Sequence, residues 1–162
     1  MERERQVHPF PPVCGEGSRV LILGSFPSKA SRDVGFYYGH KRNRFWKVLE
    51  GIFECAVPPD IGGKRRFLLE HGIALWDSIA SCTIVGSSDQ SIKDAVPNRI
   101  QELISEYPIE RIYCNGKASF ACYERYVFPL TGIHAEALPS TSPANAQKSL
   151  DELIEAWRVI IT

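Results

Sequence analysis

Residues 20–28 read Val-Leu-Ile-Leu-Gly-Ser-Phe-Pro-Ser, and this stretch decides how the chain folds. Four consecutive apolar residues are typical of a strand buried on both faces, as in a parallel sheet. A Ser/Pro loop follows it directly. A second loop of this kind, Leu138-Pro-Ser-Thr-Ser-Pro-Ala-Asn145, follows another short strand pattern. We therefore expect both loops at the carboxyl edge of one parallel sheet, where α/β proteins bind their ligands.

Strand and helix patterns alternate along the chain. The predicted strands are 19–24, 73–76, 111–114 and 134–138, and the predicted helices are 42–54, 63–71, 97–107 and 117–127. Ser149-Leu-Asp-Glu152 is a capping box that opens a last helix, which continues through Ile160. The alternation predicts an α/β fold, a three-layer α/β/α sandwich with a central parallel sheet of about four strands.

The remaining segments are expected to lack regular structure. Residues 25–41 and 80–89 read as loops, and the prolines of 7–13 predict an extended segment that packs over the domain. The chain shows no repeat and no linker, so residues 1–162 are expected to form a single domain.

Charge is balanced overall but unevenly distributed. The chain has 19 basic and 19 acidic residues, whereas nucleic-acid-binding domains commonly carry a positive excess. Basic residues nevertheless gather among aromatic residues between positions 29 and 47, at Lys29, Arg32, Lys41, Arg42, Arg44 and Lys47. Such a polarised surface can bind DNA without an overall positive charge. A second cluster, Lys64-Arg65-Arg66, fits a solvated helix face better.

Cysteine usage and hydropathy exclude several classes. The five cysteines include no CxxC pair, which argues against a disulfide framework, a zinc site and an iron–sulfur cluster. No apolar run is long enough to span a membrane, and the charged start Met1-Glu-Arg-Glu-Arg5 does not resemble a signal peptide. We expect a cytoplasmic protein that needs no metal or cofactor and has no membrane partner.

Three segments, 24–28, 37–46 and 138–145, together resemble motifs of the uracil-DNA glycosylase superfamily, most closely of its DNA-deoxyinosine (hypoxanthine-DNA) glycosylase group, often called family six. The resemblance covers nearly the whole chain. The core Asn43-Arg-Phe-Trp46 is also similar to that of the mismatch-specific uracil-DNA glycosylases. The resemblance implies an enzyme that flips a deaminated base out of DNA, hypoxanthine first, and hydrolyses its N-glycosidic bond to leave an abasic site.

The sequence departs from the superfamily pattern at three positions. Phe26 stands where members with ordinary uracil activity keep a water-activating Asp or Asn, Ser140 replaces a His or Asn, and Ala144 replaces a bulky wedge residue. The deoxyinosine group also lacks an acidic first motif, and the resemblance points to Asn43 as the replacement. Two alternatives stay open: a uracil or mismatch-specific glycosylase, and a non-catalytic module that binds lesions in DNA.

Asn43 and His40 are the candidate catalytic residues. The Asn43 carboxamide could hold a water near the sugar C1′, which is enough if the bond breaks largely by dissociation. Its alternative role is the N-cap of a helix starting at Arg44. His40 could protonate or hydrogen-bond the departing purine, or it could contact a phosphate or be structural. The other histidines, His8, His71 and His134, show no partner pattern and are expected to be structural.

The flipped base is expected to lie against residues of the first two segments. Tyr38 is the candidate stacking platform, with Phe36 or Tyr37 in its place if the register is shifted by one. Asp77, at the end of a predicted strand, could accept a hydrogen bond from a purine N1–H, or it could cap the next segment. Ser25 and Phe26 complete the predicted base-binding set, whereas Asp89 is expected to be a turn and cap residue.

DNA is the expected partner of a monomeric protein, which would be nucleoid-associated when acting on DNA. Small hydroxyl side chains and basic residues on the loops suit phosphate binding. The predicted DNA-binding residues are Ser28, Lys41, Arg42, Ser140, Thr141, Ser142, Ala144 and Asn145. Within this set, Asn145 could either enter the duplex gap or hold its own loop.

Overall fold

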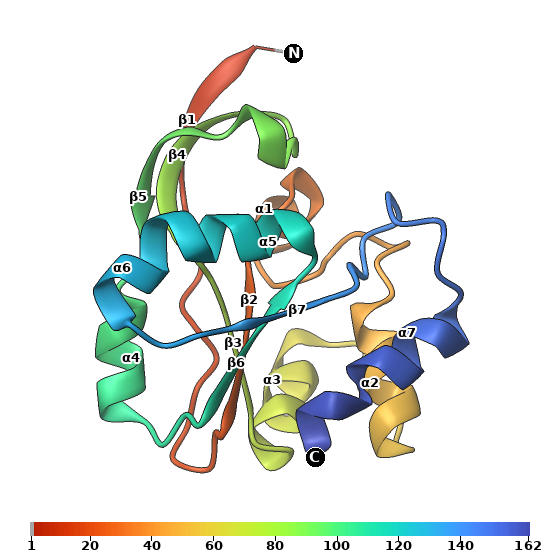
Figure 1. Ribbon diagram of the computed structural model, residues 1–162. Helices are drawn as coiled ribbons and strands as arrows, with labels where there is room; N and C mark the ends of the chain where they lie inside the picture. The colour runs from red at the N-terminus through yellow and green to blue at the C-terminus, as the bar shows by residue number, and fades with distance from the viewer. Residues whose placement is uncertain (1) are drawn as a thin grey trace.

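A computed structural model describes residues 2–162 and shows a parallel sheet at the centre of the molecule (Figure 1). The sheet has four strands in the order β3-β2-β6-β7. Their bounds are Val20–Gly24 for β2, Ile73–Asp77 for β3, Arg111–Asn115 for β6 and Glu136–Leu138 for β7. Met1, the first residue of the charged N-terminal stretch, lies outside the described residues. All four predicted strands are confirmed.

Strand β2 contributes side chains to both faces of this sheet. Val20 and Ile22 pack into one hydrophobic cluster, and Leu21 and Leu23 pack into another. Figure 1 shows helices on either side of the sheet. The first cluster includes residues of α2 (Phe45–Phe53), α3 (Ile61–Glu70) and α7 (Leu150–Trp157). The second includes residues of α4 (Ile100–Glu106) and of the π-helical turn η2 (Tyr123–Val127), which joins α5 (Lys117–Cys122) to α6 (Phe128–Thr131). The predicted three-layer sandwich is confirmed.

Helix α7 fixes the loop that follows β7. Its capping box is present, with Ser149 Oγ accepting from the Glu152 N–H and the Glu152 carboxylate accepting from the Ser149 N–H. A Cβ atom on Gly51 would overlap the Ile154 side chain, so glycine allows α2 and α7 to approach closely. The Trp157 indole N–H donates to the Pro139 carbonyl at 2.9 Å. The turn η3 (Arg158–Ile161) ends the chain.

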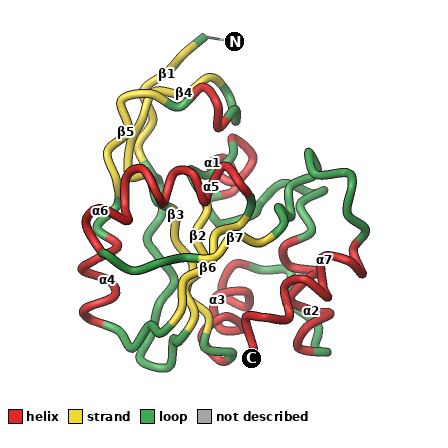
Figure 2. The backbone as a smooth tube through the Cα atoms, viewed as in Figure 1, coloured by secondary structure: helices red, strands yellow, loops and turns green. Residues whose placement is uncertain are grey.

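A second, antiparallel sheet lies beyond the carboxyl edge of the first, at the top of Figures 1 and 2. Its strands are β1 (Arg3–Val7), β4 (Ile79–Val85) and β5 (Lys93–Pro97), in the order β1-β4-β5. The prediction of a loop over 80–89 is therefore wrong as far as Val85. Strand β4 pairs with β1, so that Val85 lies opposite Arg3. A local pattern cannot reveal a partner so far away in the sequence.

The segment before β2 and the segment after it are more ordered than a loop. Within residues 7–13, Val7 ends β1 and Val13 exchanges backbone hydrogen bonds with Leu75, whereas Phe10 lies at a bend. The predicted loop 25–41 contains helix α1 (Lys29–Val34). Ser28 Oγ caps it by accepting from the Ser31 N–H, and Gly35 ends it at a φ of 85°. A Ser before the first turn and a Gly after the last are ordinary helix signals, and the sequence carries both.

Across residues 2–162, no helix has the length and apolar character that crossing a membrane would require.

Candidate active site

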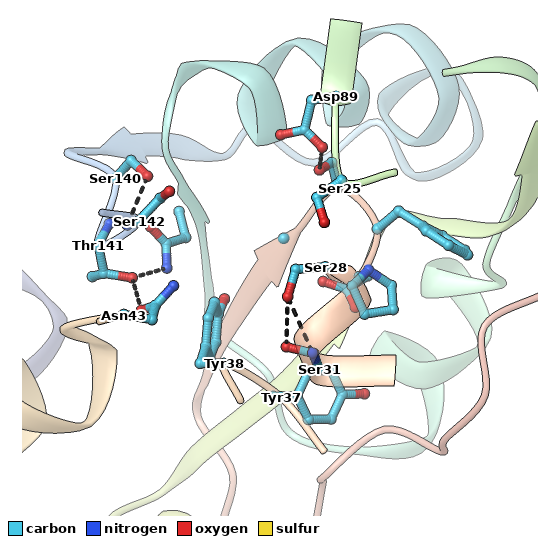
Figure 3. Close-up of a pocket in the computed structure, with 16 residues that line it drawn as sticks. Ser25, Ser28, Ser31, Tyr37, Tyr38, Asn43, Asp89, Ser140, Thr141 and Ser142 are labelled. Atoms are coloured by element: carbon cyan, nitrogen blue, oxygen red, sulfur yellow. Dashed lines mark hydrogen bonds between the residues drawn. The ribbon is translucent and has the colours of Figure 1, made fainter. Parts of the chain in front are cut away.

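The parallel strands end side by side, and a pocket of about 180 Å³ lies at this edge. Strand β3 ends at Asp77, β2 at Gly24 and β6 at Asn115, and Gly24 lies opposite Asp77 in the register. The loop that follows β7 lies at the same edge. The lining, drawn in Figure 3, consists of Gly24, Ser25, Phe26, Pro27, Ser28, Ser31, Tyr37, Tyr38, Asn43, Asp77, Ser87, Asp89, Asn115, Ser140, Thr141 and Ser142.

Most of the residues predicted for the site meet in this pocket. The predicted residues that line it are Ser25, Phe26, Ser28, Tyr38, Asn43, Asp77, Ser140, Thr141 and Ser142. The predicted residues outside its lining are His40, Lys41, Arg42, Ala144 and Asn145. Asn115 was missed, although an Asn at the end of a buried strand is a usable signal for a ligand-binding edge.

A chain of hydrogen bonds joins Asn115, Thr141 and Asn43. Asn115 Oδ1 accepts from the Thr141 N–H at 3.0 Å, which leaves Asn115 Nδ2 as the donor to Thr141 Oγ1 at 2.9 Å. Thr141 Oγ1 then donates to Asn43 Oδ1 at 2.8 Å (Figure 3). Thr141 is fully buried. The donor and the acceptor of each hydrogen bond in this chain are therefore fixed.

The orientation of the Asn43 carboxamide follows from this chain. Its Oδ1 also accepts from the Phe45 N–H at 3.0 Å, so both lone pairs of the oxygen are used. The N-cap role considered for Asn43 is not met, because Arg44 is the N-cap of α2; Asn43 instead accepts from the N–H of Phe45, the first residue of the helix. The Nδ2 group makes no hydrogen bond within residues 2–162 and belongs to a pocket-lining side chain. Asn43 consequently offers the pocket a hydrogen-bond donor.

A second aromatic ring packs against one face of the Tyr38 ring. It stacks on Phe45 with ring centroids 4.1 Å apart and an interplanar angle of 21°. Its backbone has a φ of 53°, which is uncommon for a residue with a side chain. Burial raises the pKa of the Tyr38 phenol, so it stays protonated at neutral pH. The neighbouring Phe36 and Tyr37 are both 2% exposed and pack in the core, although Tyr37 also contributes to the pocket lining.

Asp77 has a buried partner that the sequence did not reveal. Its Oδ2 lies 2.7 Å from His8 Nε2, and the two side chains are only 6% and 5% exposed. The sequence showed no partner pattern for His8, because this partner lies 69 residues away in the chain. Oδ1, the other carboxyl oxygen, lies beside Gly24, where a Cβ atom would overlap it. Within residues 2–162 no donor reaches Oδ1.

Asp89 is a second carboxyl group in the same pocket, and its side chain does more than the turn and cap role expected for it. It begins the turn η1 (Asp89–Ser91) and accepts a hydrogen bond from Ser25 Oγ at 2.6 Å (Figure 3). Burial raises the pKa of Asp89, the hydrogen bond from Ser25 opposes this, and the charge of Asp77 raises it further. Asp89 therefore gains its proton at a higher pH than an exposed carboxyl does.

Phe26 occupies the place of the missing first-motif carboxyl or amide and faces the second sheet. Its ring packs in a cluster with Ile79, Cys82 and Ile84. The Arg32 guanidinium lies 5.6 Å from the ring centroid. The side chain is 7% exposed and offers no polar atom.

Apart from Lys29, which pairs with Asp33, the basic residues between positions 29 and 47 fall into two groups. Lys41, Arg42 and Lys47 are exposed, and their side chains make no hydrogen bond or ion pair within residues 2–162. Arg32 and Arg44 instead donate to backbone carbonyls, Arg44 to those of Asn145 and Lys148. The side chains of the first group are therefore free to contact phosphates, whereas those of the second group hold loops together.

The loop that begins at Ser140 is held by its own polar groups. Ser140 Oγ accepts from the Ser142 N–H, and Ser142 Oγ accepts from the Ala144 N–H. Asn145 Nδ2 donates to the Ser140 carbonyl at 3.0 Å, which is the loop-holding role considered for it. Ala144 is exposed at the outer end.

His40 lies outside the pocket on an exposed turn. Its Nδ1 accepts a hydrogen bond from the Arg42 N–H at 3.0 Å. The predicted role of His40 as proton donor to the departing purine is not supported by this position. In residues 2–162, no group of three or more His, Cys, Asp or Glu side chains is arranged to hold a metal ion.

Comparison with known proteins identifies the family. The sequence profile of the uracil DNA glycosylase superfamily matches residues 11–160, so the chain belongs to this superfamily. Hypoxanthine DNA glycosylase from Methanosarcina barkeri (strain Fusaro / DSM 804) is 33% identical over 150 residues, which are 91% of this chain and 93% of the relative. A protein of the same name from Methanosarcina acetivorans is 32% identical over 93% of this chain and 95% of its own length.

A solved structure shares the fold. The solution NMR structure of a protein from Methanosarcina acetivorans, described as a candidate uracil DNA glycosylase, aligns with a TM-score of 0.77 and 30% identity. The alignment covers 94% of this chain and 97% of that protein.

The pKa shift of Asp89 gives a prediction about stability. Because burial raises this pKa, the ionised carboxyl destabilises the fold above it, and the penalty disappears as pH falls and Asp89 gains its proton. Asp89→Asn should therefore raise the melting temperature at pH 8 by about 2–4 °C, which corresponds to roughly 1 kcal/mol at this size. The difference from the natural chain should shrink as the pH falls. Thermal melting monitored by circular dichroism across pH 4–8 measures it.

Asp33→Asn is the matched control for this experiment. Asp33 has a 66% exposed side chain in a surface pair with Lys29. Asp33→Asn should therefore not raise the melting temperature more at high pH than at low pH. A lower melting temperature for Asp89→Asn at pH 8 would mean that the ionised carboxyl is stabilised in the folded state.

Proposed function

We propose that this member of the uracil DNA glycosylase superfamily hydrolyses the N-glycosidic bond of deaminated bases in DNA, hypoxanthine first, and leaves an abasic site. The observation that carries the proposal is the pocket at the ends of β2, β3 and β6, where an aromatic platform, a free amide donor and a free carboxyl oxygen meet. The names of the Methanosarcina relatives, at about one third identity over most of both chains, support hypoxanthine as the substrate.

Three side chains have distinct roles in this proposal. The flipped base stacks on the face of Tyr38 that Phe45 does not cover. Asp77 Oδ1 accepts a hydrogen bond from the base. Asn43 Nδ2 donates to the oxygen of a water near the sugar C1′ and keeps it in place. Since Asn43 Oδ1 is saturated, Asn43 positions this water but does not take its proton.

The reaction then depends on dissociation of the bond. The base departs with the bonding electron pair, and the resulting sugar cation captures the water. In the balanced reaction, C1′ gains a hydroxyl and the base gains a proton. Asp89 is the pocket carboxyl that can accept the proton released by the water, since Asp77 uses one oxygen for His8 and the other for the base. The departing base takes a proton from solvent, and Asp89 returns its proton to solvent. Phe26 cannot serve, because its side chain is a hydrocarbon.

One assay separates the candidate functions. Duplex oligonucleotides that hold a single hypoxanthine, uracil or xanthine are incubated with the protein, and abasic sites are then cleaved with alkali. Cleavage at hypoxanthine above uracil supports the proposal, and the reverse order would indicate a uracil or mismatch-specific glycosylase. Tight binding without cleavage would indicate a non-catalytic lesion-binding module. We further propose that the protein acts as a single-domain monomer in the cytoplasm and associates with the nucleoid when it engages DNA.

Replacement of Asn43 tests the water-positioning role. Asn43→Ala should reduce single-turnover base release by about 10²–10³-fold, the scale of losing one well-placed polar group at a charged transition state. Binding to lesion DNA should change much less, because the group acts on the transition state.

The control separates this effect from the loss of a hydrogen bond at the start of a helix. Ser149→Ala removes the cap of α7, which is not one of the pocket-lining residues, and should cost about 1 kcal/mol of stability. It should leave base release unchanged. If Asn43→Ala is destabilised to the same extent yet cleaves at the normal rate, Asn43 only holds the start of α2.

Tyr38 is predicted to act on capture of the flipped base. Tyr38→Ala should weaken binding to hypoxanthine DNA by about 1–3 kcal/mol, the contribution of one base stacked on an aromatic side chain. Fluorescence anisotropy with lesion and undamaged duplexes measures the difference. Tyr38→Phe keeps the ring on Phe45 and should bind nearly normally. Equal losses on lesion and undamaged DNA would place the base elsewhere.

The exposed cations give a prediction about salt. A double change, Lys41→Glu with Arg42→Glu, should weaken binding to all duplexes and flatten the dependence of log K on log salt by about 0.9 for each phosphate that the protein no longer neutralises. The matched control is Arg66→Glu with Lys93→Glu, which changes the same charge on exposed residues outside the pocket lining. Titration of binding between about 50 and 200 mM salt measures both, and equal slopes would place the DNA-binding surface elsewhere.

A further inference from the structure

The His8–Asp77 pair brings the N-terminal segment to the base pocket. His8 lies after β1, 69 residues from Asp77 in the sequence, and its ring packs between Phe10, Phe26 and Tyr37. Its Nδ1 lies 2.8 Å from the Phe10 carbonyl oxygen, and its Nε2 lies 2.7 Å from Asp77 Oδ2. Both side chains are almost completely buried.

The number of protons in this pair follows from its contacts. A carbonyl oxygen only accepts, so His8 Nδ1 must carry a proton that it donates to Phe10. A hydrogen bond between Nε2 and Oδ2 then needs one more proton on the line between them. That proton belongs either to an imidazolium beside a carboxylate or to a carboxylic acid beside a neutral imidazole. In both arrangements, Asp77 Oδ1 carries no proton.

We propose that His8 is a specificity-determining residue, which keeps Asp77 Oδ1 a pure hydrogen-bond acceptor toward the flipped base. This inference rests on the proposed function. By keeping the shared proton between its Nε2 and Asp77 Oδ2, His8 prevents Oδ1 from acting as a donor. The pocket then accepts bases that present an N–H group at this point and rejects bases that present a lone pair.

This requirement matches the chemistry of deamination. When adenine becomes hypoxanthine, N1 changes from an acceptor to an N–H donor, and N3 changes in the same way when cytosine becomes uracil. An obligate acceptor therefore pairs with either product and repels either parent base. Guanine and thymine already carry the corresponding N–H, so this discrimination concerns adenine and cytosine.

The other polar groups of the pocket leave this role to Asp77. Burial raises the pKa of both Tyr37 and Tyr38, which remain neutral phenols. Asp89 accepts from Ser25 and has its own raised pKa. Neither the hydroxyls nor the amides of the lining donate to Asp77 Oδ1 within residues 2–162. The oxygen is thus open to the base.

The test compares two bases that differ at N1. Single-turnover release is measured from duplexes with hypoxanthine and with unsubstituted purine, whose N1 is an acceptor. The natural chain should strongly prefer hypoxanthine, as sites built to hydrogen-bond an N–H do. In His8→Phe, which keeps the ring packing, Asp77 Oδ2 loses its partner, and nothing then holds Oδ1 in the acceptor role. The preference should therefore fall by about tenfold or more.

Two further variants provide the controls. His8→Gln can donate to Asp77 Oδ2 without a titratable proton and should restore the preference to within about threefold of the natural value. His71→Phe changes another aromatic-packed histidine, which bonds to the Phe67 carbonyl away from the pocket, and should leave the preference unchanged. His8→Leu replaces His8→Phe if the latter does not fold, as judged by circular dichroism.

Each outcome decides the proposal. An equal loss on both bases in His8→Phe, with an unchanged ratio, would mean that His8 only ties the N-terminal segment to the sheet and would overturn the inference. A natural chain that releases both bases at the same rate would also overturn it. If the natural chain releases no hypoxanthine, the proposed function fails, and the ratio of binding affinities for the same two duplexes then tests the role of His8 separately.

Discussion

The register of β2 between β3 and β6 is the constraint on which the site depends. Parallel pairing places Gly24 opposite Asp77 and leaves the loops that follow all three strands at one edge. The side chain of Asp77 fills the space beside Gly24, where no Cβ atom could fit. A register shift of one residue would exchange the faces of the buried strand and separate these groups.

Hydrogen bonds between the loops convert this edge into a defined geometry. Asn115 comes from β6, Thr141 from the loop after β7 and Asn43 from the segment before α2, yet they form one continuous chain. Because the backbone N–H groups of Thr141 and Phe45 fix both ends, the free amide of Asn43 has one orientation. Groups held in this way need no rearrangement as charge develops on a substrate.

The sequence predicted those parts of the molecule that depend on local patterns. The apolar run 20–23 predicted β2, and the Ser/Pro loops and aromatic segment predicted most of the pocket lining. Strand β1, the His8–Asp77 pair and the role of Asp89 were not predicted. Each depends on a partner more than sixty residues away, such as Val85 for Arg3 or Ser25 for Asp89. Periodicity reveals which face of a segment is buried, but it does not identify the segment that covers it.

Several features of the pocket lower the stability of the folded protein. Tyr38 has a positive φ and a buried hydroxyl without a partner in residues 2–162, and Asp89 is a carboxyl whose ionisation is opposed by burial. In the protein without a ligand, each of these features is destabilising. The core clusters on both faces of the sheet supply the stability that tolerates them. Such local conflicts are expected where a site is shaped for a bound molecule, because the ligand can satisfy groups that the folded chain leaves open.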